Sequence, residues 1–371
     1  MKNERIYWRV VALISMFIAV LIMGIWYKVD TGYQPNQAQL TSVAQAKNEI
    51  SKLYQSQGQS IEHKVNVPTG VFIHSMHFDS ANDIYFNGYL WQKFPKGLDI
   101  GEGQTFIFPE EVKGIKVPVV EHDVLVGNER VIVWYFEVLA RQPFNYSHYP
   151  LDHKTAWLKI LPPIGEDWVF ISDLSGYPKT GLQDKFGLDN NIVLGGWKVD
   201  DTFFDYKLNT YQTNLGFLDT MLGEVPELHF NVVLKRKFSN AFVVHLIPMI
   251  TVFVLLFALL LTLSHCPKKE AAHGFSIMGI IGSIAALFFV VVLSHAEVRT
   301  QFATQEVVYI EFYYLTMYVL MILTVVVSFI YNVPNRWFSP LVARDALWIK
   351  LAYWPASLFA LFIVSYLVLM H

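Results

Sequence analysis

The segment Glu227–Pro248, "ELHFNVVLKRKFSNAFVVHLIP", decides the architecture of this chain. Its first part alternates polar and apolar residues, a pattern typical of a β-strand. Its second part begins the apolar stretch Ala241–Leu263, which is long enough to cross a membrane as a helix. Because only the short run Lys235–Asn240, with three basic residues, separates the two, the sequence predicts a strand that continues into a membrane span without a linker.

The composition also indicates a membrane protein with a large water-exposed part. Of the 371 residues, 53% are apolar, and the mean hydropathy is +0.34. The net charge of −3 gives no reason to expect a nucleic-acid partner. Cys266 is the only cysteine, so an intrachain disulfide is excluded and the water-exposed part must be held together by packing.

Membrane spans account for both ends of the chain. A helical span needs about 20 apolar residues, because a helix rises about 1.5 Å per residue and the hydrocarbon core is about 30 Å thick. The qualifying stretches are Val10–Trp26, Ala241–Leu263, Gly274–Leu293, Val307–Tyr331 and Trp348–Met370. The first stands alone, and the other four follow one another closely at the C-terminus.

Basic residues near the spans predict the orientation, because they are enriched on the cytoplasmic side. If the chain crosses five times, three basic groups fall on one side: Lys2, Arg5 and Arg9; Lys268 and Lys269; Arg336 and Arg344. The residues between the first and second spans, the "SHAEVRTQFATQE" loop and His371 then lie outside the cytoplasm. Lys235–Lys237 lie on the outer side as well and break this pattern.

We predict that residues 1–28 form a retained N-terminal anchor. The apolar run Val10–Trp26 is longer than the roughly 7–15 residues of a signal-peptide core. No small-x-small cleavage site follows it in "GIWYKVDTGYQ". A cleaved signal peptide remains the alternative.

Between the anchor and the other spans, the sequence predicts a linker with a short amphipathic helix over residues 29–62 and a β-sandwich over residues 63–238. Leu40, Val43, Ile50 and Leu53 have helical spacing. Short segments rich in β-branched and aromatic residues follow, separated by Gly, Pro, Asn and Asp, as in an antiparallel sandwich. They read "VFIHSMHF", "IYFNGYLWQKF", "RVIVWYFEVLA", "TAWLKIL", "IVLGGWKV", "YKLNTYQTNL" and "ELHFNVVLKRK". Residues 239–371 form the predicted four-helix membrane domain.

This order of parts resembles the pentameric ligand-gated ion channels, the family of the Cys-loop receptors and their bacterial relatives, over residues 40–371. "YPLDHKTA" resembles the family's Phe-Pro-Phe-Asp-x-Gln-x-Cys stretch. Gln142 and Ala156 stand at the two cysteine positions, as in bacterial members without the disulfide. "NGYLWQKFP", "LKRKFSNAFVVHLIP" and "RDALWIKLAYWPASLFALFIVSY" resemble the second strand, the pre-membrane strand and the last helix. The N-terminal span and the short link Asn332–Leu347 depart from the usual pattern, and the second fits a bacterial member.

The resemblance implies a homopentameric ligand-gated channel of a bacterial inner membrane, with the β-sandwich in the periplasm. A small ligand or ion would bind the sandwich and open a pore near residues 271–293. The implied coupling residues are Tyr149, Pro150, Leu151, Asp152, Arg236 and Pro248. Asp152 is expected to meet Arg236, which would explain the outer basic run. A solvated ion pair without a role is the alternative.

The resemblance also implies that the second helix of the membrane domain lines the pore. Its expected lining is Glu270, His273, Ile277, Ile280, Ile284 and Leu287. A ring of isoleucines would gate by dewetting, and a ring of Glu270 would favour cations. The reverse face carries Ala272, Ser276, Gly279, Ser283 and Ala286 and would give a wider, wetter pore.

Family ligands bind in a box of aromatic residues, which suits a cationic amine. The candidates by position are Trp91, Trp168, Phe170, Tyr177, Tyr211 and Phe217. A structural role in the core is the alternative for each of them. His74 and His77 are three residues apart on a strand and therefore face opposite sides, so we expect no shared metal ion and no cofactor.

No nucleophile elbow, phosphate loop or zinc-protease motif is present in the sequence, so an enzyme is not expected. The leading alternative to a channel is a non-conducting sensor or scaffold that keeps the channel fold. Its extra N-terminal span would then bind another membrane protein. An accessory subunit of a transporter is a third, weaker interpretation.

Overall fold

The computed structural model describes residues 2–35, 39–56, 63–101, 103–178, 185–216, 222–263, 277–302, 307–332 and 339–370. The chain divides into two compact units. The helical unit comprises Met1–Tyr33, Asn145–Asp152 and Arg236–His371. The β unit comprises Gln34–Phe144 and His153–Lys235. The chain thus enters the helical unit three times.

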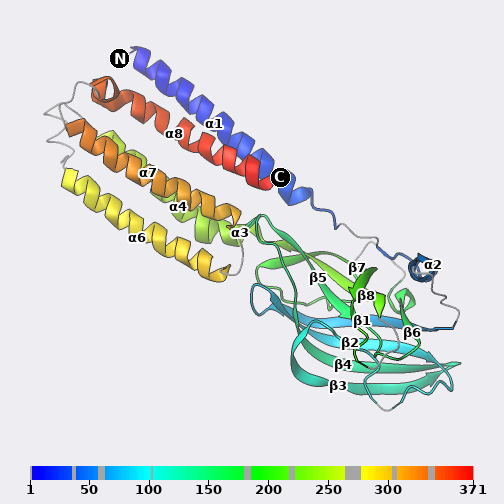
Figure 1. The fold of residues 1–371 in the computed structure, drawn as a ribbon. Coiled ribbons are helices and arrows are strands. Elements are labelled where there is room, and N and C mark those ends of the chain that lie inside the picture. The colour runs from blue at the N-terminus through cyan, green and yellow to red at the C-terminus, as the bar shows by residue number, and fades with distance from the viewer. Residues whose placement is uncertain are drawn as a thin grey trace. The chain divides into compact units, whose positions relative to one another are not determined.

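The helical unit is a bundle of long apolar helices (Figure 1). Its elements are α1 (Lys2–Thr31), α3 (Phe238–Ala241), a π-helical turn (Phe242–Leu246), α4 (Ile247–Thr262), α6 (Ile277–Gln301), α7 (Tyr309–Asn332) and α8 (Ser339–Leu369). Five helices among the described residues are long and apolar enough to span a membrane. The chain is therefore a multi-span membrane protein with a β domain, and the predicted fold class is confirmed.

The N-terminal helix α1 packs along α8, beside which it runs in Figure 1. Aromatic residues at both ends of α1 extend these contacts. Tyr7 contacts Trp348 of α8, with ring centroids 5.9 Å apart. Near the other end, Trp26 Nε1 donates a hydrogen bond of 2.7 Å to the Tyr309 hydroxyl of α7. The predicted anchor is thus packed against the other helices of its own chain.

Helix α6 is longer than the predicted span Gly274–Leu293. It continues to Gln301, so most of the predicted "SHAEVRTQFATQE" loop is helical. The added turns carry His295 and Arg299 to the start of α7, where both contact Glu311. Hydropathy could not detect these turns, because it marks only apolar stretches and these turns are rich in polar residues. Polar residues such as glutamate and arginine nevertheless form helices about as readily as apolar ones.

The β unit contains two sheets, shown in Figure 1. One has five strands in the order β3-β4-β2-β1-β6, and the other has three in the order β5-β8-β7. The strands are β1 (Val65–Phe78), β2 (Asp83–Pro95), β3 (Glu111–Val126), β4 (Glu129–Arg141), β5 (His153–Ile160), β6 (Trp168–Ser172), β7 (Trp197–Tyr211) and β8 (Gly223–Arg236). The predicted sheets are antiparallel, but β6 pairs with β1 in parallel.

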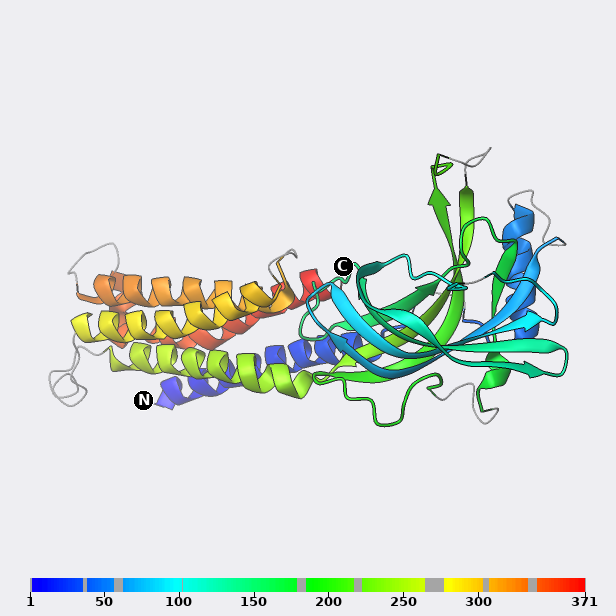
Figure 2. The same cartoon turned by 90° about the horizontal axis from the view of Figure 1, so that it is seen from below.

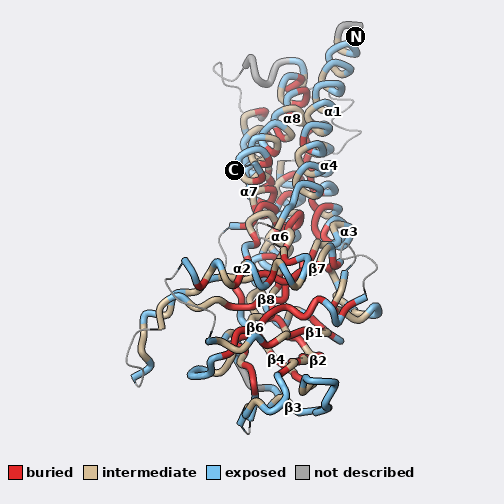
Figure 3. The backbone as a smooth tube through the Cα atoms, turned by 90° about the vertical axis from the view of Figure 1, so that its right-hand side faces the viewer, coloured by how far each residue is buried: buried red, intermediate tan, exposed pale blue. Residues whose placement is uncertain are grey.

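Alternate residues of the strands form the core of the β unit, seen as buried segments in Figure 3. Burial alternates along the whole of β2, as expected for a strand with one buried face. Phe230 of β8 packs against Phe204 of β7, with ring centroids 5.0 Å apart. Gly187 has a φ of +72°, and a Cβ there would lie 2.8 Å from the Phe230 ring, so the close packing requires glycine.

Helix α2 (Val43–Ser56) covers part of the β unit, as its predicted amphipathic pattern requires. Ile50 and Tyr54 are buried against Val169 of β6. Strands β3 and β6 were not predicted, and the predicted strands "IVLGGWKV" and "YKLNTYQTNL" contribute to one long strand, β7.

Candidate functional site

The predicted Tyr-Pro-Leu-Asp corner belongs to the helical unit, although it lies in the sequence between β4 and β5. The Tyr149 ring packs on Phe302, which follows α6, at a centroid distance of 4.6 Å. The backbone N–H of Tyr309 donates a hydrogen bond of 2.8 Å to the Ser147 carbonyl. The corner therefore contacts the end of α6 and the start of α7.

Asp152 and Arg236 form a bidentate ion pair, as expected. Arg236 Nε and Nη2 donate to the two carboxylate oxygens at 2.5 and 3.0 Å. The side chains of Asp152 and Arg236 are only 2% and 12% exposed, so the pair is largely removed from water. The guanidinium carbon also lies 4.7 Å from the centre of the Tyr149 ring. Such a pair is costly to break, because removing either member takes a counter-charge away from the other in a place that water hardly reaches.

The remaining coupling candidates lie in the same unit. Pro150 and Leu151 line a shallow apolar hollow together with Trp26 of α1. Pro248 lies in the first turn of α4, where proline is compatible with a helix, and contributes to a small cavity with Tyr314. No pattern in the sequence predicted that α1 would reach the corner.

Helix α6 buries one of its two predicted faces in its own chain. Ile280 and Ile284 are buried, and Ile277 and Leu287 are half-buried. The opposite face is exposed, with Gly279, Ser283 and Ala286. The small-residue face, the alternative lining, is therefore the more exposed of the two faces in this structure. Glu270, His273, Ala272 and Ser276 lie outside the described residues.

Three of the six aromatic candidates for ligand binding are core residues of the β unit. Trp168, Phe170 and Tyr177 are each less than 9% exposed. The Tyr177 hydroxyl donates a hydrogen bond of 2.7 Å to the Val71 carbonyl and accepts one from the Val71 N–H. These bonds fix Tyr177 as a link between its loop and β1.

Two other aromatic candidates are half-buried, and the structure does not bring them together into a box. Trp91 Nε1 donates to Asp173 at 2.8 Å, and its ring packs on Tyr177. Tyr211 lies at the end of β7 and donates to Glu227 of β8 at 2.6 Å. Phe217, in the segment that joins β7 to β8, lies outside the described residues.

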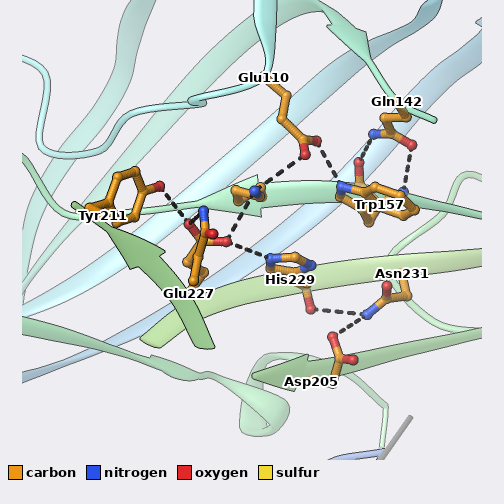
Figure 4. Close-up of polar contacts among 10 residues, drawn as sticks. Glu110, Gln142, Trp157, Asp205, Tyr211, Glu227, His229 and Asn231 are labelled. Carbon is orange, nitrogen blue, oxygen red and sulfur yellow. Dashed lines mark hydrogen bonds and ion pairs between the residues drawn. The ribbon is translucent and has the colours of Figure 1, made fainter. Parts of the chain in front are cut away.

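Tyr211 is part of a buried polar cluster on the three-stranded sheet, shown in Figure 4 and here called the Glu227 cluster. Its centre is the Glu227 carboxylate, which is 1% exposed. Lys159 Nζ lies 3.0 Å from Glu227 Oε2 and 3.3 Å from Glu110 Oε1, so it bridges two carboxylates. The His229 Nε2 atom lies 3.3 Å from Glu227 Oε2.

Hydrogen bonding keeps Glu227 ionised despite its burial. Burial alone would raise the pKa of the carboxyl group, but the hydrogen bonds from His229, Tyr211 and Lys159 lower the pKa to about 2. The Tyr211 pKa rises to about 12, through burial and its bond to Glu227. The cluster thus holds a fixed negative charge at the base of the β7–β8 hairpin.

The cluster also contains buried polar atoms that lack a partner among the described residues. They are His229 Nδ1 and Asn231 Oδ1. Asn231 Nδ2 donates to Asp205 at 2.6 Å, and burial raises the Asp205 pKa while this bond offsets part of the rise. Unpaired buried polar atoms are uncommon in folded proteins, so this part of the sheet is a candidate for ligand recognition.

The sequence carries one signal for this cluster. Glu227, His229 and Asn231 alternate with Leu228 and Phe230, so three polar residues share one face of a strand. Their burial could not be predicted, because Lys159, Glu110 and Tyr211 come from distant parts of the chain.

No family model matches the chain, and a search of curated proteins found no match.

Proposed function

We propose that the chain is a subunit of a homopentameric ligand-gated ion channel of a bacterial inner membrane, with its β domain in the periplasm. One observation carries the proposal: the corner Asn145–Asp152 is part of the helical unit, and its buried Asp152 pairs with Arg236. A loop that joins two strands of the β domain is therefore built into the bundle beside α6. That is the connection a ligand-gated pore needs.

Strand β8 supplies a direct route from ligand to helices. It runs without interruption from the Glu227 cluster to Arg236, and α3 begins two residues later. With about 3.3 Å per residue, the nine steps from Glu227 to Arg236 span roughly 30 Å. We infer that a small ligand or ion at the β7–β8 hairpin rearranges the Glu227 cluster and displaces β8 along this path. In Figure 2 the hairpin ends of both strands project from the β domain.

The exposed face of α6 is the proposed pore lining. Gly279, Ser283 and Ala286 would give a wide, wettable pore in its inner half. Glu297 is exposed near the outer end of α6, and five copies would form an acidic ring that favours cations. The isoleucine face then packs the helix against its own chain.

The test is current from purified protein in planar bilayers, with cysteine substitutions as reporters of the pore. In a Cys266→Ser background, Ser283→Cys should allow a charged thiol reagent to block most of the current. The matched control Ile284→Cys, one residue away on the buried face, should be insensitive. Block through Ile284→Cys alone would instead support the isoleucine lining.

Current itself distinguishes the channel from the alternative function, a non-conducting sensor. If the protein forms pentamers and a ligand changes its structure without any current, the sensor interpretation replaces the channel. A stable monomer or trimer in detergent, measured by light scattering, would contradict the pentamer.

A further inference from the structure

Tyr309, the first residue of α7, contacts the corner through its backbone and has a buried side chain. Its N–H donates a hydrogen bond of 2.8 Å to the Ser147 carbonyl, and the N–H of Ile310 donates one of 3.3 Å to the Tyr149 carbonyl. The first N–H groups of a helix have no acceptor within the helix itself. The corner supplies these acceptors, so the positions of the corner and of the start of α7 depend on each other.

The hydroxyl group of Tyr309 meets polar side chains from three helices. Trp26 Nε1 of α1 and the Tyr313 hydroxyl of α7 each lie 2.7 Å from it, and Ser365 Oγ of α8 lies 2.6 Å from it. Tyr313 and Ser365 are buried, and Trp26 is half-buried. Helices α1 and α8, which run side by side in Figure 1, are thus both bonded to the residue that holds the corner.

The number of protons fixes the direction of each hydrogen bond. Ser365 Oγ donates its proton to the Leu361 carbonyl at 2.7 Å, so it accepts from Tyr309. An indole N–H can only donate, so Trp26 donates to the Tyr309 oxygen. Because Tyr309 uses its only proton on Ser365, Tyr313 donates to it as well. The Tyr309 hydroxyl therefore donates once and accepts twice, which is its full capacity.

Trp26 holds its place through apolar contacts in addition to this hydrogen bond. Its ring lies 5.6 Å from the Phe238 ring and 6.4 Å from the Tyr313 ring. It also lines the apolar hollow to which Pro150 and Leu151 of the corner contribute. Helix α1 therefore reaches the corner both beside these two residues and through the Tyr309 hydroxyl.

We propose that α1 and α8 set the position of the corner through Tyr309, which makes α1 a regulatory helix of its own chain. Trp26 and Ser365 fix the Tyr309 hydroxyl, and the Tyr309 backbone fixes the corner. A displacement of α1 or α8 then changes how the corner is held, because a buried network with every group paired has two arrangements, intact or broken. That the corner gates a pore rests on the proposed function, whereas the link from α1 to the corner does not.

Hydrogen exchange of backbone amides, measured by mass spectrometry on the full-length protein in detergent, tests this link without current. Tyr309→Phe should speed exchange of the amides of residues 309 and 310 at least about tenfold, because the hydroxyl no longer holds the first turn of α7. Ser365→Ala, which changes α8 alone, should act in the same direction. Tyr353→Phe is the matched control, because it removes another tyrosine hydroxyl, which donates from α8 to the Phe253 carbonyl at 2.9 Å. It should leave the exchange of these two amides unchanged.

A combined variant distinguishes a chain of contacts from general destabilisation. If Ser365 acts on the corner through Tyr309, Ser365→Ala should not speed exchange further in a Tyr309→Phe background, whereas independent effects would add. Should Tyr309→Phe fail to fold, Trp26→Phe and Ser365→Ala each remove one partner of the hydroxyl and should each speed exchange of the two amides. Wild-type exchange in both of them, or equal acceleration in Tyr353→Phe, would overturn the proposal.

The open probability in planar bilayers tests the regulatory consequence. Trp26→Phe and Ser365→Ala should each change it about fivefold or more, and Tyr353→Phe should not change it. Faster exchange with an unchanged open probability would show that the link is only structural and would overturn the regulatory role of α1. Absence of current from the wild type would contradict the proposed function instead, and the exchange rates would still decide whether α1 and α8 hold the corner.

Discussion

Asp152 and Asp123 each accept two hydrogen bonds from one arginine, but their surroundings differ. The Asp123–Arg130 pair has bonds of 2.9 and 2.7 Å, and its side chains are about 40% exposed. The Asp152–Arg236 pair has similar geometry and is nearly buried. An exposed pair contributes little to stability because water and salt screen it, whereas a buried charge that loses its partner is strongly destabilising.

We therefore predict that Asp152→Asn lowers stability by about 2–4 kcal/mol and that Asp123→Asn lowers it by less than about 1 kcal/mol. Asparagine keeps the shape of the corner but removes the negative charge that Asp152 places beside Arg236. The measurement is the apparent unfolding midpoint of the detergent-solubilised variants. Equal shifts in both variants would show that the burial of the Asp152 pair has no energetic consequence.

The effect of the Asp152–Arg236 pair on gating can be measured separately from its effect on stability. If the pair is tighter in one conducting state, its removal shifts the equilibrium by the difference between the states. A double-mutant cycle on Asp152 and Arg236, measured as open probability, isolates this coupling. Additive effects of the two single substitutions would show that the two residues are not coupled in gating.

The lowered pKa of Glu227 predicts that the stability of the folded protein depends on pH. Its pKa is about 2 in the folded protein and 4.5 as an ordinary glutamate, so the folded state favours the ionised form. The resulting stabilisation, on the order of 3 kcal/mol, is complete above pH 4.5 and is lost as the pH falls toward 2. Glu227→Gln should weaken this acid-dependent loss of stability.

The exposed Glu224 on the same strand is the control, and Glu224→Gln should keep the pH dependence of the wild type. The measurement is the unfolding midpoint at a series of pH values from 5 to 2.5, compared among the three proteins. A wild-type slope in Glu227→Gln would place the acid-sensitive group elsewhere.

At the scale of elements, Glu311 joins α6 to α7. Its carboxylate accepts from Arg299 Nη1 at 3.1 Å and from the backbone N–H of Val308 at 2.8 Å. His295 Nε2 lies 3.3 Å from the same carboxylate. One side chain thus caps the start of α7 and pairs with the last turns of α6.

We predict that Glu311→Gln lowers the unfolding midpoint by the equivalent of about 1–2 kcal/mol. The loss is moderate because Arg299 is 44% exposed and glutamine can still cap Val308. Glu297→Gln removes an exposed carboxylate from α6 and should change the midpoint little. If both variants behave alike, Glu311 does not join the two helices energetically.

The sequence predicted some helices and strands and missed others, and the difference lies in how each element is stabilised. The membrane helices and β2, β4 and β8 were predicted, because apolar length or strict alternation marks an element that buries a large surface. Strand β3 was missed because it is an edge strand with Gly114, Pro118 and several register shifts, features that read as a loop. Strand β6 is too short for a periodic signal.

The candidate site, like the fold, was predicted only in part from the sequence. Asp152 and Arg236 were expected to pair, and they do so. The Glu227 cluster depends on Lys159 and Glu110, which the sequence places far from Glu227 and only the fold brings together. The faces of α6 could not be distinguished by spacing, because both repeat with the helical period. In the fold, packing within the chain buries Ile280 and Ile284 and leaves the small-residue face exposed.

At the scale of the whole molecule, three chain segments that are separated in the sequence form the helical unit. The chain passes between the two units at residues 33–34, 144–145, 152–153 and 235–236. Two of these passages flank the corner, and another follows Lys235 at the end of β8. Several covalent connections can carry a displacement to the helices more directly than a single flexible linker could.

Helix α1 supplies the remaining segment, and its packing bears on whether it is retained. Trp8 packs against Phe257 of α4 at 6.3 Å, and Trp26 packs against Phe238 of α3 at 5.6 Å. The Trp26 hydrogen bond to Tyr309 adds a polar contact inside the bundle. A signal peptide that is removed after export has no need of such contacts with several helices of the mature chain.

We therefore predict that the mature protein keeps α1. The intact mass of protein extracted from membranes should correspond to the full chain, and N-terminal sequencing should begin at or near Met1. A start between Tyr27 and Gln39 would show that α1 is a signal peptide. Trp26→Phe provides a further check, because it removes the hydrogen bond to Tyr309 and part of the ring contact with Phe238, and it should lower the unfolding midpoint by the equivalent of at least about 1 kcal/mol. If α1 is absent from the mature protein, this substitution cannot change the midpoint at all.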